Sequence, residues 1–579
     1  MRADVSSTPN ELTANGRASA VSRGPARRFA VPSPLAVIVL AGLALRLALL
    51  ARDVPTLDSD EATLGLMGIH LLHGQWFAYF WGQQYMGSLE AILAAPLIAV
   101  LGPTTLALRL PVILMGLGAV ATVYALGERL FSRRVGLVCA TLLAIGPAFF
   151  DTLSSRTRGG YVETLLIGNL LLLLVLGANP ARLLTRRRCA LLGILAGVGL
   201  WTNVLIAPYL LATAALLWLQ RRREVFSRTG LALLAGVALG GLPAIVYNAT
   251  HGAPTLTNVL GLTVAGSGSR HSMIPLGLMR HIVTELTTSL PILAGGFLGG
   301  SQADGFTLGD YQAAMRAHPF LYALTMAIVL AAVALFALAL TQTARAVRRL
   351  LAMRPDGQVG VGDTEERQRQ YGRAALLLVV VLYAAAFCLS SQSDIVATPR
   401  YLFPLYAGAP LVVGQAETLL RQAGARWTAL SGRRARTALL AVPLAALVTW
   451  NLAGAISLTP TQTAARDHGV WITGDDQPLL ALLRAHHVRT VISNDYWEGL
   501  RLSYESGETI IPVMVTPEGH PGFNRYRPYV REGLADARPA YVELRGTPEA
   551  VQHHQAALSG ALPGYRETTV GLYTVLVPA

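Results

Sequence analysis

The sequence predicts an α-helical polytopic membrane protein with about eleven transmembrane helices and a small C-terminal α/β domain. Three observations carry this prediction. First, 53% of the 579 residues are apolar and only 14% are charged, whereas a soluble chain has about a quarter charged residues. Second, the apolar residues gather in runs close to the ~20 residues that cross a bilayer. Third, these runs shrink to strand length after Leu458.

The candidate spans follow one another between residues 33 and 457. They lie near 33–51, 106–127, 135–150, 161–178, 189–203, 204–220, 230–247, 319–341, 374–390, 401–420 and 437–457. The two spans between 189 and 220 are short, and Trp201, Thr202 and Asn203 are their expected turn. The apolar stretch 88–101 is also short, so we expect a helix that lies at the membrane interface.

The segments outside the spans differ in composition. Residues 1–32 are polar and rich in Arg, which predicts a disordered basic tail in the cytoplasm. Residues 351–373 are expected to form a flexible loop. Within 458–579 the apolar runs are short, which predicts strands at 490–493, 541–544 and 572–577 and a helix at 478–487. About 120 residues suffice for a small α/β domain.

The basic residues are distributed unevenly along the chain. There is no lysine, so all 47 basic residues are arginine. Residues 1–457 hold 37 arginines and 20 acids, whereas residues 458–579 hold 10 arginines and 13 acids. The formal charge of +14 therefore belongs to the hydrophobic part, which argues against a nucleic-acid partner. The three cysteines lie in apolar runs, which excludes a disulfide framework.

The arginines also predict the orientation of the chain. With the N-terminus in the cytoplasm, 28 of the 37 arginines fall on the cytoplasmic side and seven on the other side, as the positive-inside rule requires. This orientation places four loops outside, at 52–105, 151–160, 248–318 and 391–400. We therefore predict a multi-pass protein of the plasma (inner) membrane whose C-terminal domain is extracytoplasmic.

The first outer loop, 52–105, carries the clearest chemical signal. Asp58, Asp60 and Glu61 place three carboxylates in four positions just after the first span. Such proximity costs repulsion, although acids in the first turn of a helix also complement its dipole. Glu90 adds a carboxylate at the start of the short apolar helix. An ionisable group near the bilayer usually faces a cavity and is functional, although Glu90 could also cap the helix.

Two arginine motifs lie on the same side. Arg158-Gly159-Gly160-Tyr161 follows the third span, where Arg158 could hold an anion or pair with Glu163. The glycines would let the backbone approach a ligand closely. Pro399-Arg400-Tyr401 begins the tenth span, where the guanidinium offers a fork for phosphate oxygens or extends to the interface.

These acids and arginines converge on one membrane face. Carboxylates can accept a proton from a hydroxyl or hold a divalent cation, and arginines can hold a phosphate. A lipid phosphate that carries an activated group has its head at that depth. The sequence thus predicts a reaction between a lipid-linked substrate and an acceptor outside the cytoplasm.

At these residues the sequence resembles the GT-C superfamily of polytopic glycosyltransferases. The most similar branch is that of the protein mannosyltransferases and aminoarabinose transferases, glycosyltransferase family 39. The motifs that carry the resemblance are Asp60-Glu61, Tyr85 to Glu90, Arg109-Leu110-Pro111, Arg158-Gly159-Gly160-Tyr161 and Pro399-Arg400-Tyr401-Leu402. They cover most of residues 35–420. The segments Asp495-Tyr496-Trp497 and Ser506-Gly507-Glu508 look like the outer domain of uncharacterised bacterial members.

The resemblance implies transfer of a hexose or pentose from a polyprenyl-phosphate donor, with inversion at the anomeric carbon. It makes Asp60 or Asp58 the general base, since Ser59 separates two aspartates, and Glu61 its support. Glu90 would orient the acceptor or bind a metal.

The resemblance further implies that Arg400 and Arg158 neutralise the leaving phosphate, with Tyr161 and Tyr401 in the substrate site. It makes no cofactor certain and leaves open a divalent cation held by Asp60 and Glu90. The partners implied are the donor, membrane lipids and an acceptor glycan, lipid or protein.

A transporter or flippase of lipid-linked sugars is the main alternative. It would need inverted repeats and charged or broken helices at mid-membrane, whereas the acids here concentrate in the loops. An O-antigen polymerase or ligase shares the general chemistry but fits the acidic pair of the first loop less well.

Overall fold

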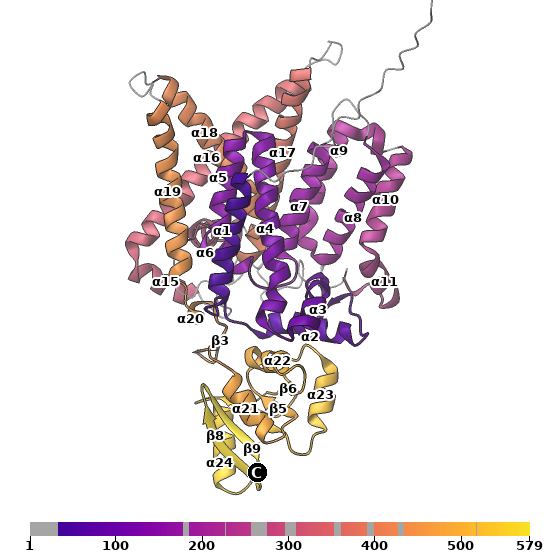
Figure 1. Cartoon of the computed structure of the whole chain (residues 1–579), viewed down its shortest axis with the longest axis vertical. Coiled ribbons are helices and arrows are strands. Elements are labelled where there is room, and N and C mark those ends of the chain that lie inside the picture. The colour runs from indigo at the N-terminus through magenta and orange to yellow at the C-terminus, as the bar shows by residue number, and fades with distance from the viewer. Residues whose placement is uncertain are drawn as a thin grey trace, which may run out of the picture.

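The structure is a computed structural model that describes residues 33–177, 184–225, 227–255, 275–295, 308–352, 361–390, 399–426, 433–516 and 518–579. The tail expected at 1–32 lies outside them. Most of the described residues are helical. Figure 1 shows a bundle of long helices with a smaller unit of strands and helices at one end, which includes the C-terminus.

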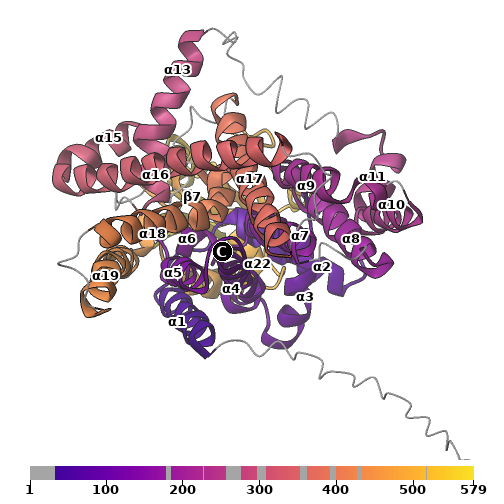
Figure 2. The same cartoon turned by 90° about the horizontal axis from the view of Figure 1, so that it is seen from above.

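The helices of the bundle mostly coincide with predicted spans, but those within 275–317 lie in the loop expected at 248–318. In chain order they are α1 (Ser33–Leu50), α4 (Thr105–Leu130), α5 (Arg133–Ala144), α6 (Ala148–Leu153), α7 (Tyr161–Leu176), α8 (Arg186–Thr202), η1 (Val204–Ile206), α9 (Ala207–Val225), α10 (Arg228–Gly240), α11 (Leu242–Thr250), α13 (Pro275–Thr284), η2 (Glu285–Ser289), α14 (Leu290–Leu293), α15 (Leu308–Ala317), α16 (Pro319–Ala352), α17 (Val361–Cys388), η4 (Pro399–Gly408), α18 (Ala409–Arg426) and α19 (Arg433–Ser457). Viewed along the bundle, α8, α10 and α11 lie on one side and α19 on the other (Figure 2).

Within the described residues, three helices are long and apolar enough to cross a membrane: α4, α16 and the part of α17 at Thr364–Cys388. The pair α10 and α11, bent by 63°, makes a fourth if it counts as one span. Several other predicted spans correspond to shorter apolar helices, among them α1 and α7. The total of eleven spans stays a prediction.

Two of the expected spans are not continuous α-helices in the structure. The expected span 135–150 is interrupted, because α5 ends before Gly146-Pro147 and α6 begins after it. Proline has no N–H for the helical ladder and restricts the residue before it. The expected span 401–420 begins as a 3₁₀ helix, η4, and becomes α-helical at Ala409.

The loop expected at 351–373 is wrong for its second half, because α17 already begins at Val361. The charged residues there extend the helix. Gln368 donates to the carbonyl of Leu176 at 2.7 Å, and Arg373 donates to the carbonyl of Leu130 at 2.7 Å. These side chains bind the exposed carbonyls at the ends of neighbouring helices.

The first outer loop forms a layer at the end of the bundle. It contains α2 (Ser59–Leu72), the short strands β1 (Tyr79–Phe80) and β2 (Gln83–Gly87), and α3 (Leu89–Leu101). The helix expected from the short apolar run 88–101 is therefore present as α3. In Figure 1, α2 and α3 lie between the bundle and the C-terminal unit.

The C-terminal unit is built on a five-stranded sheet with the order β6-β5-β7-β9-β8. β5 pairs in parallel with β6 and β7, while β9 is antiparallel to β7 and β8. Its elements are α20 (Pro460–Thr463), β3 (Arg466–Asp467), β4 (Val470–Trp471), α21 (Gln477–Ala485), β5 (Thr490–Ser493), α22 (Tyr496–Glu505), β6 (Ile511–Met514), α23 (Arg527–Leu534), β7 (Ala540–Leu544), α24 (Pro548–Leu558), β8 (Tyr565–Val570) and β9 (Tyr573–Pro578). The residues expected to form strands and a helix here lie in β5, β7, β9 and α21.

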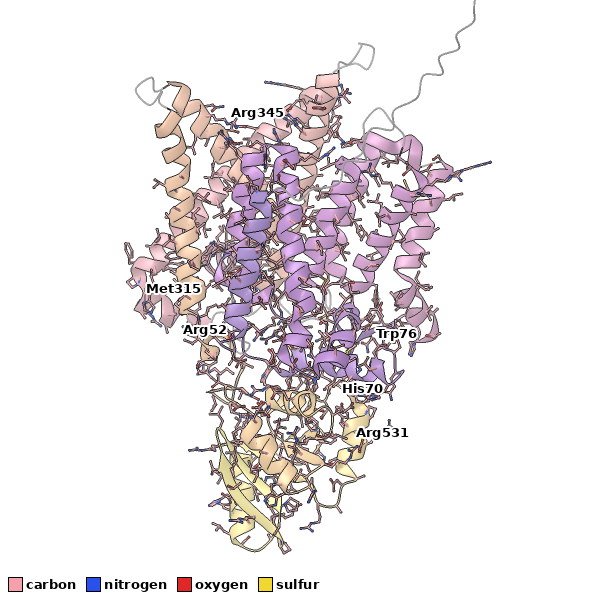
Figure 3. All side chains as sticks on the ribbon, viewed as in Figure 1. Arg52, His70, Trp76, Met315, Arg345 and Arg531 are labelled. Atoms are coloured by element: carbon pink, nitrogen blue, oxygen red, sulfur yellow. The ribbon has the colours of Figure 1, made fainter. Side chains whose placement is uncertain are left out.

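A hydrophobic core joins this unit to the outer-loop layer. Residues of α2, α3 and the start of α4 pack with residues of α22, β6 and α23 in one buried cluster. At Gly65 of α2 a Cβ atom would lie 2.4 Å from the ring of Tyr504 in α22, so only glycine permits this approach. Figure 3 places Arg52, His70 and Trp76 where the two parts meet, and Arg345 at the opposite end of the bundle.

Candidate active site

The start of α2 fixes the three acids of the first outer loop. Asp58 is the N-cap, and its Oδ1 accepts the backbone N–H of Glu61 at 3.0 Å. Ser59 binds the C-terminal unit: its hydroxyl donates to the carbonyl of Trp497 at 3.0 Å and accepts the N–H of Leu500 at 3.1 Å. The acids therefore do complement the helix N-terminus, as the dipole argument expected.

Asp60 lies where the two parts of the molecule meet. Its Oδ2 accepts from Arg158 at 3.2 Å. Its Oδ1 accepts from Arg525 at 2.7 Å and from the hydroxyl of Tyr496 at 2.7 Å, both of which belong to the C-terminal unit. The side chain keeps 19% of its surface exposed, against 3% for Asp58 and none for Glu61. Asp60 is thus the most accessible of the three carboxylates.

The cations around Asp60 control its protonation. Burial by itself would raise the pKa of Asp60, but Arg525, Arg158, the Tyr496 hydroxyl and Arg400 outweigh it and lower the pKa to about 2. The carboxylate is therefore ionised at physiological pH. The effect of Arg400 also shows that the tenth predicted span brings its guanidinium within electrostatic range of Asp60.

Glu61 has a different environment one residue further along. It is fully buried and accepts two bonds from Arg109, from Nε at 2.8 Å and from Nη2 at 2.7 Å. Arg156 lies 3.0 Å from it, and the N–H of Thr157 donates to it at 3.2 Å. Both oxygens are occupied, so Glu61 supports the loop and does not face a substrate.

Asp58 and the two loop arginines complete this layer. Arg158 donates to Asp58 as well as to Asp60, which differs from the pairing with Glu163 that the sequence left open. Arg156 lies 3.8 Å from Asp58 and donates to the carbonyl of Thr56 at 2.6 Å. Since Asp58 is both a helix cap and an ion-pair partner at 3% exposure, the geometry favours Asp60 over Asp58 as the reacting carboxylate.

Glu90 is bound by the glycine pair. The N–H groups of Gly159 and Gly160 donate to its two oxygens at 2.8 and 3.3 Å. Both glycines have positive φ, 78° and 93°, which a side chain would strain. Burial and the neighbouring Glu163 raise the pKa of Glu90 well above its usual value. The glycines were expected to approach a ligand; here their amides bind Glu90 instead.

Three of the residues expected to bind substrate lie close together. The rings of Tyr161 and Tyr401 are 5.8 Å apart, and the guanidinium of Arg400 lies 5.8 Å from the ring of Tyr401. Burial raises the pKa of Tyr85 to about 12, and the groups that act on its charge are Tyr401, Arg400, Arg525 and Asp60. Tyr85 therefore lies within electrostatic range of both Asp60 and Arg400.

The partners of Asp60 and Glu90 do not fit a metal site. Among the residues that the structure describes, no group of three or more His, Cys, Asp or Glu side chains could hold an ion. The oxygens of Asp60 accept from two guanidinium groups and a phenol, and those of Glu90 from backbone amides. Since these donors occupy positions that a cation would need, no step below uses one.

Sequence reasoning missed two contributors to this site. Tyr496 stood in a motif that was noted only for its likeness to other outer domains, and Arg525 stood in none. They lie 436 and 465 positions after Asp60, so no local pattern connects them with it. It also missed the buried pair of Arg46 and Asp151, 3.0 Å apart inside the bundle.

A family model matches part of the chain. Residues 87–247 match the family model of dolichyl-phosphate-mannose-protein mannosyltransferases. This segment contains Glu90, Arg158 and Tyr161 but neither Asp60 nor Arg400. A search of the curated proteins finds no match.

Solved structures show the same fold. The chain is similar to ArnT from Cupriavidus metallidurans in the apo state, with 11% identity, a TM-score of 0.54 and coverage of 94% of this chain and 97% of ArnT. It is also similar to the same protein bound to undecaprenyl phosphate, with 12% identity, a TM-score of 0.52 and the same coverage.

Proposed function

We propose that this protein transfers a sugar from a polyprenyl-phosphate donor to an acceptor hydroxyl, supported by the family-model match over residues 87–247 and by the fold shared with ArnT. The reaction takes place on the extracytoplasmic side of the cell membrane and inverts the anomeric carbon. The observation that carries the proposal is the setting of Asp60: an ionised, partly exposed carboxylate in electrostatic range of Arg400.

In this reaction Asp60 takes the proton of the acceptor hydroxyl. The acceptor oxygen then bonds to the anomeric carbon, and the bond from that carbon to the phosphate oxygen breaks on the opposite face. A carboxylate with a pKa of about 2 is a weak base, so it takes the proton only after the new bond has begun to form and the hydroxyl has become acidic.

The leaving polyprenyl phosphate keeps the electron pair of the broken bond and needs a nearby positive charge. Arg400 supplies it, because preorganised cations stabilise charge that develops in the transition state. Arg158, whose guanidinium bridges Asp58 and Asp60, orients the base in this proposal. That ArnT has been solved with undecaprenyl phosphate supports a polyprenyl-linked donor.

The test is a transfer assay with the purified full chain in lipid vesicles. Polyprenyl-phosphate hexoses and pentoses labelled in the sugar are supplied with a native membrane extract as acceptor, and the released polyprenyl phosphate is measured. We expect release by the wild type and a loss of about 10³-fold in Asp60→Asn.

Asp475→Asn, at an exposed aspartate of the C-terminal unit, is the matched control and should keep full activity. Movement of intact labelled donor across the membrane without release of polyprenyl phosphate would make the protein a transporter. Normal release by Asp60→Asn would remove Asp60 from the reaction.

A further inference from the structure

The C-terminal unit contributes two side chains to the proposed base. The hydroxyl of Tyr496 and Nη2 of Arg525 both donate to Oδ1 of Asp60 at 2.7 Å, and Nε of Arg525 donates to the Tyr496 oxygen at 2.7 Å. The three groups form a closed triangle of hydrogen bonds. One corner belongs to the first outer loop and two belong to a unit more than 400 positions later in the chain.

Tyr496 is held rigidly at the start of α22. Asp495 is the N-cap of that helix and accepts the N–H of Trp497 at 2.9 Å. Ser59, next to Asp60, bonds to the main chain of the same helical turn at Trp497 and Leu500. These hydrogen bonds join the first turns of α2 and α22. They therefore fix the position of the Tyr496 hydroxyl relative to Asp60.

Arg525 is held by its neighbour and by aromatic rings. The amide of Asn524 exchanges two hydrogen bonds with the main chain of Met514 in β6, at 3.0 and 2.8 Å. The guanidinium lies 4.9 Å from the rings of Phe80 and of Phe523. Cation–π contacts of this kind hold a guanidinium in place without occupying its N–H donors.

The hydrogen-bond capacity of Asp60 then decides which oxygen can react. Each carboxylate oxygen offers about two acceptor positions. Tyr496 and Arg525 fill both positions on Oδ1, whereas Arg158 is the single donor to Oδ2 among the described residues. One acceptor position on Oδ2 is therefore left for a reactant.

We propose that Tyr496 and Arg525 are positioning residues for Asp60: they fix the carboxylate through Oδ1 and direct Oδ2 to the acceptor hydroxyl. This inference rests on the proposed function. The proton of the acceptor passes to Oδ2, while the acceptor oxygen bonds to the anomeric carbon and the phosphate leaves with the electron pair. Docking of the C-terminal unit on α2 thus completes the site.

The test uses the full chain in the transfer assay above. Tyr496→Phe keeps the ring but removes the hydroxyl, so kcat should fall roughly tenfold because the base loses its fixed geometry. The affinity for undecaprenyl phosphate, measured by direct binding, should not change. The matched control is Tyr504→Phe, since the hydroxyl of Tyr504 also bonds across the two parts, to the carbonyl of Thr104 at 3.0 Å, without touching Asp60.

Arg525 provides the second variant. Arg525→Gln should lower kcat more than Tyr496→Phe, and Arg525→Lys, which keeps the charge, should restore part of it. Arg489→Gln is its control, because Arg489 forms an exposed pair with Glu532 in the same unit. If Arg525 had only a structural role, Arg525→Lys would not restore kcat. Arg525→Gln would then lower the melting temperature as well as kcat.

Two failures can be told apart. If the wild type releases no polyprenyl phosphate, the proposed function is wrong. If the wild type is active and Asp60→Asn is not, but Tyr496→Phe and Arg525→Gln match their controls in kcat, the positioning role alone is overturned.

Discussion

Asp60 and Glu61 are neighbours in the chain, and each lies among arginines, but the two clusters differ in their access to solvent. In the closed cluster, which we define as Glu61, Arg109 and Arg156, the side chains of Glu61 and Arg109 are fully buried. In the open cluster, defined as Asp60, Arg158, Arg525 and Tyr496, Asp60 keeps 19% of its side chain exposed.

The comparison distinguishes a carboxylate that stabilises the fold from one that can take part in a reaction. A buried carboxylate whose oxygens are all occupied can only hold the fold together, and losing one partner leaves an uncompensated charge. A partly exposed carboxylate that is held on one oxygen can still react on the other. The sequence pattern could not distinguish the surroundings of the two acids, because the difference arises from their partners in α4, the 154–160 loop and the C-terminal unit.

The largest expected effect is on the closed cluster. Glu61→Gln removes the charge that compensates Arg109 in a fully buried position, so the free energy of unfolding should fall by about 3 kcal/mol. Thermal unfolding in detergent measures this, with Asp60→Asn as the control that keeps a near-normal melting temperature. A Glu61→Gln protein that melts normally but transfers no sugar would place Glu61 in the chemistry and abolish the contrast.

The sequence predicted much of the fold because spanning helices follow a strong local rule. A run of about 20 apolar residues has few alternatives, and the expected spans and the observed helices lie at the same places from α1 to α19. The rule failed where polar contacts decide whether a segment is helical, as in the first half of α17. There Gln368 and Arg373 bind carbonyls of α7 and α4. These partners are distant in the chain, so no local sequence pattern indicates them.

The site was predictable only in part for the same reason. The motifs identified Asp60, Arg158 and Arg400, and the structure brings these groups within electrostatic range of one another. The partner of Arg158 was left open between an anion and Glu163, and the structure gives it Asp58 and Asp60. The sequence marked Gly159 and Gly160 as a place where the backbone can approach a partner closely, but it did not show that their amides bind Glu90.

The second effect concerns Arg400, which lies within electrostatic range of Asp60 in the open cluster. Arg400→Ala should weaken the binding of undecaprenyl phosphate about 10- to 100-fold, because a hydrogen bond to a charged group contributes roughly 1.5–3 kcal/mol. Arg400→Lys should weaken it less, since it keeps the charge but loses the fork. Binding measured directly on the full chain checks this, with the exposed Arg316 of α15 changed to Ala as control. Equal affinity in Arg400→Ala and Arg316→Ala would contradict a phosphate role.

The smallest effect is expected at a partly exposed ion pair that joins α2 to the C-terminal unit. His70 of α2 and Glu508 of the C-terminal unit are 2.6 Å apart, with side chains 8% and 22% exposed. Burial would lower the pKa of His70, but its bonds to Glu508 and Gln75 raise it overall. Burial would raise the pKa of Glu508, but its bonds to His70 and Tyr529 lower it overall.

The sign of the pH dependence follows from these two shifts. The raised pKa of His70 means that its contribution is complete below its unfolded value of about 6.5 and is lost as the pH rises through the folded value. The lowered pKa of Glu508 means that its contribution is present above about 4.3 and is lost in acid. Between these limits the contact should be strongest, and it should add about 1 kcal/mol, since the pair is partly solvated.

Melting of the wild type at pH 5.5 and pH 8 measures this contribution, and His70→Gln should remove most of the difference (these two pH values are chosen on either side of about 6.5). His520→Gln, at an exposed histidine of the same unit, should keep the difference. A pH dependence that survives in His70→Gln would mean that another group titrates between the two parts. If the pH dependence disappears in His70→Gln, the docking of the C-terminal unit on α2 is weakened as the pH rises. The geometry of the open cluster should then loosen with it, because Tyr496 reaches Asp60 across that same interface.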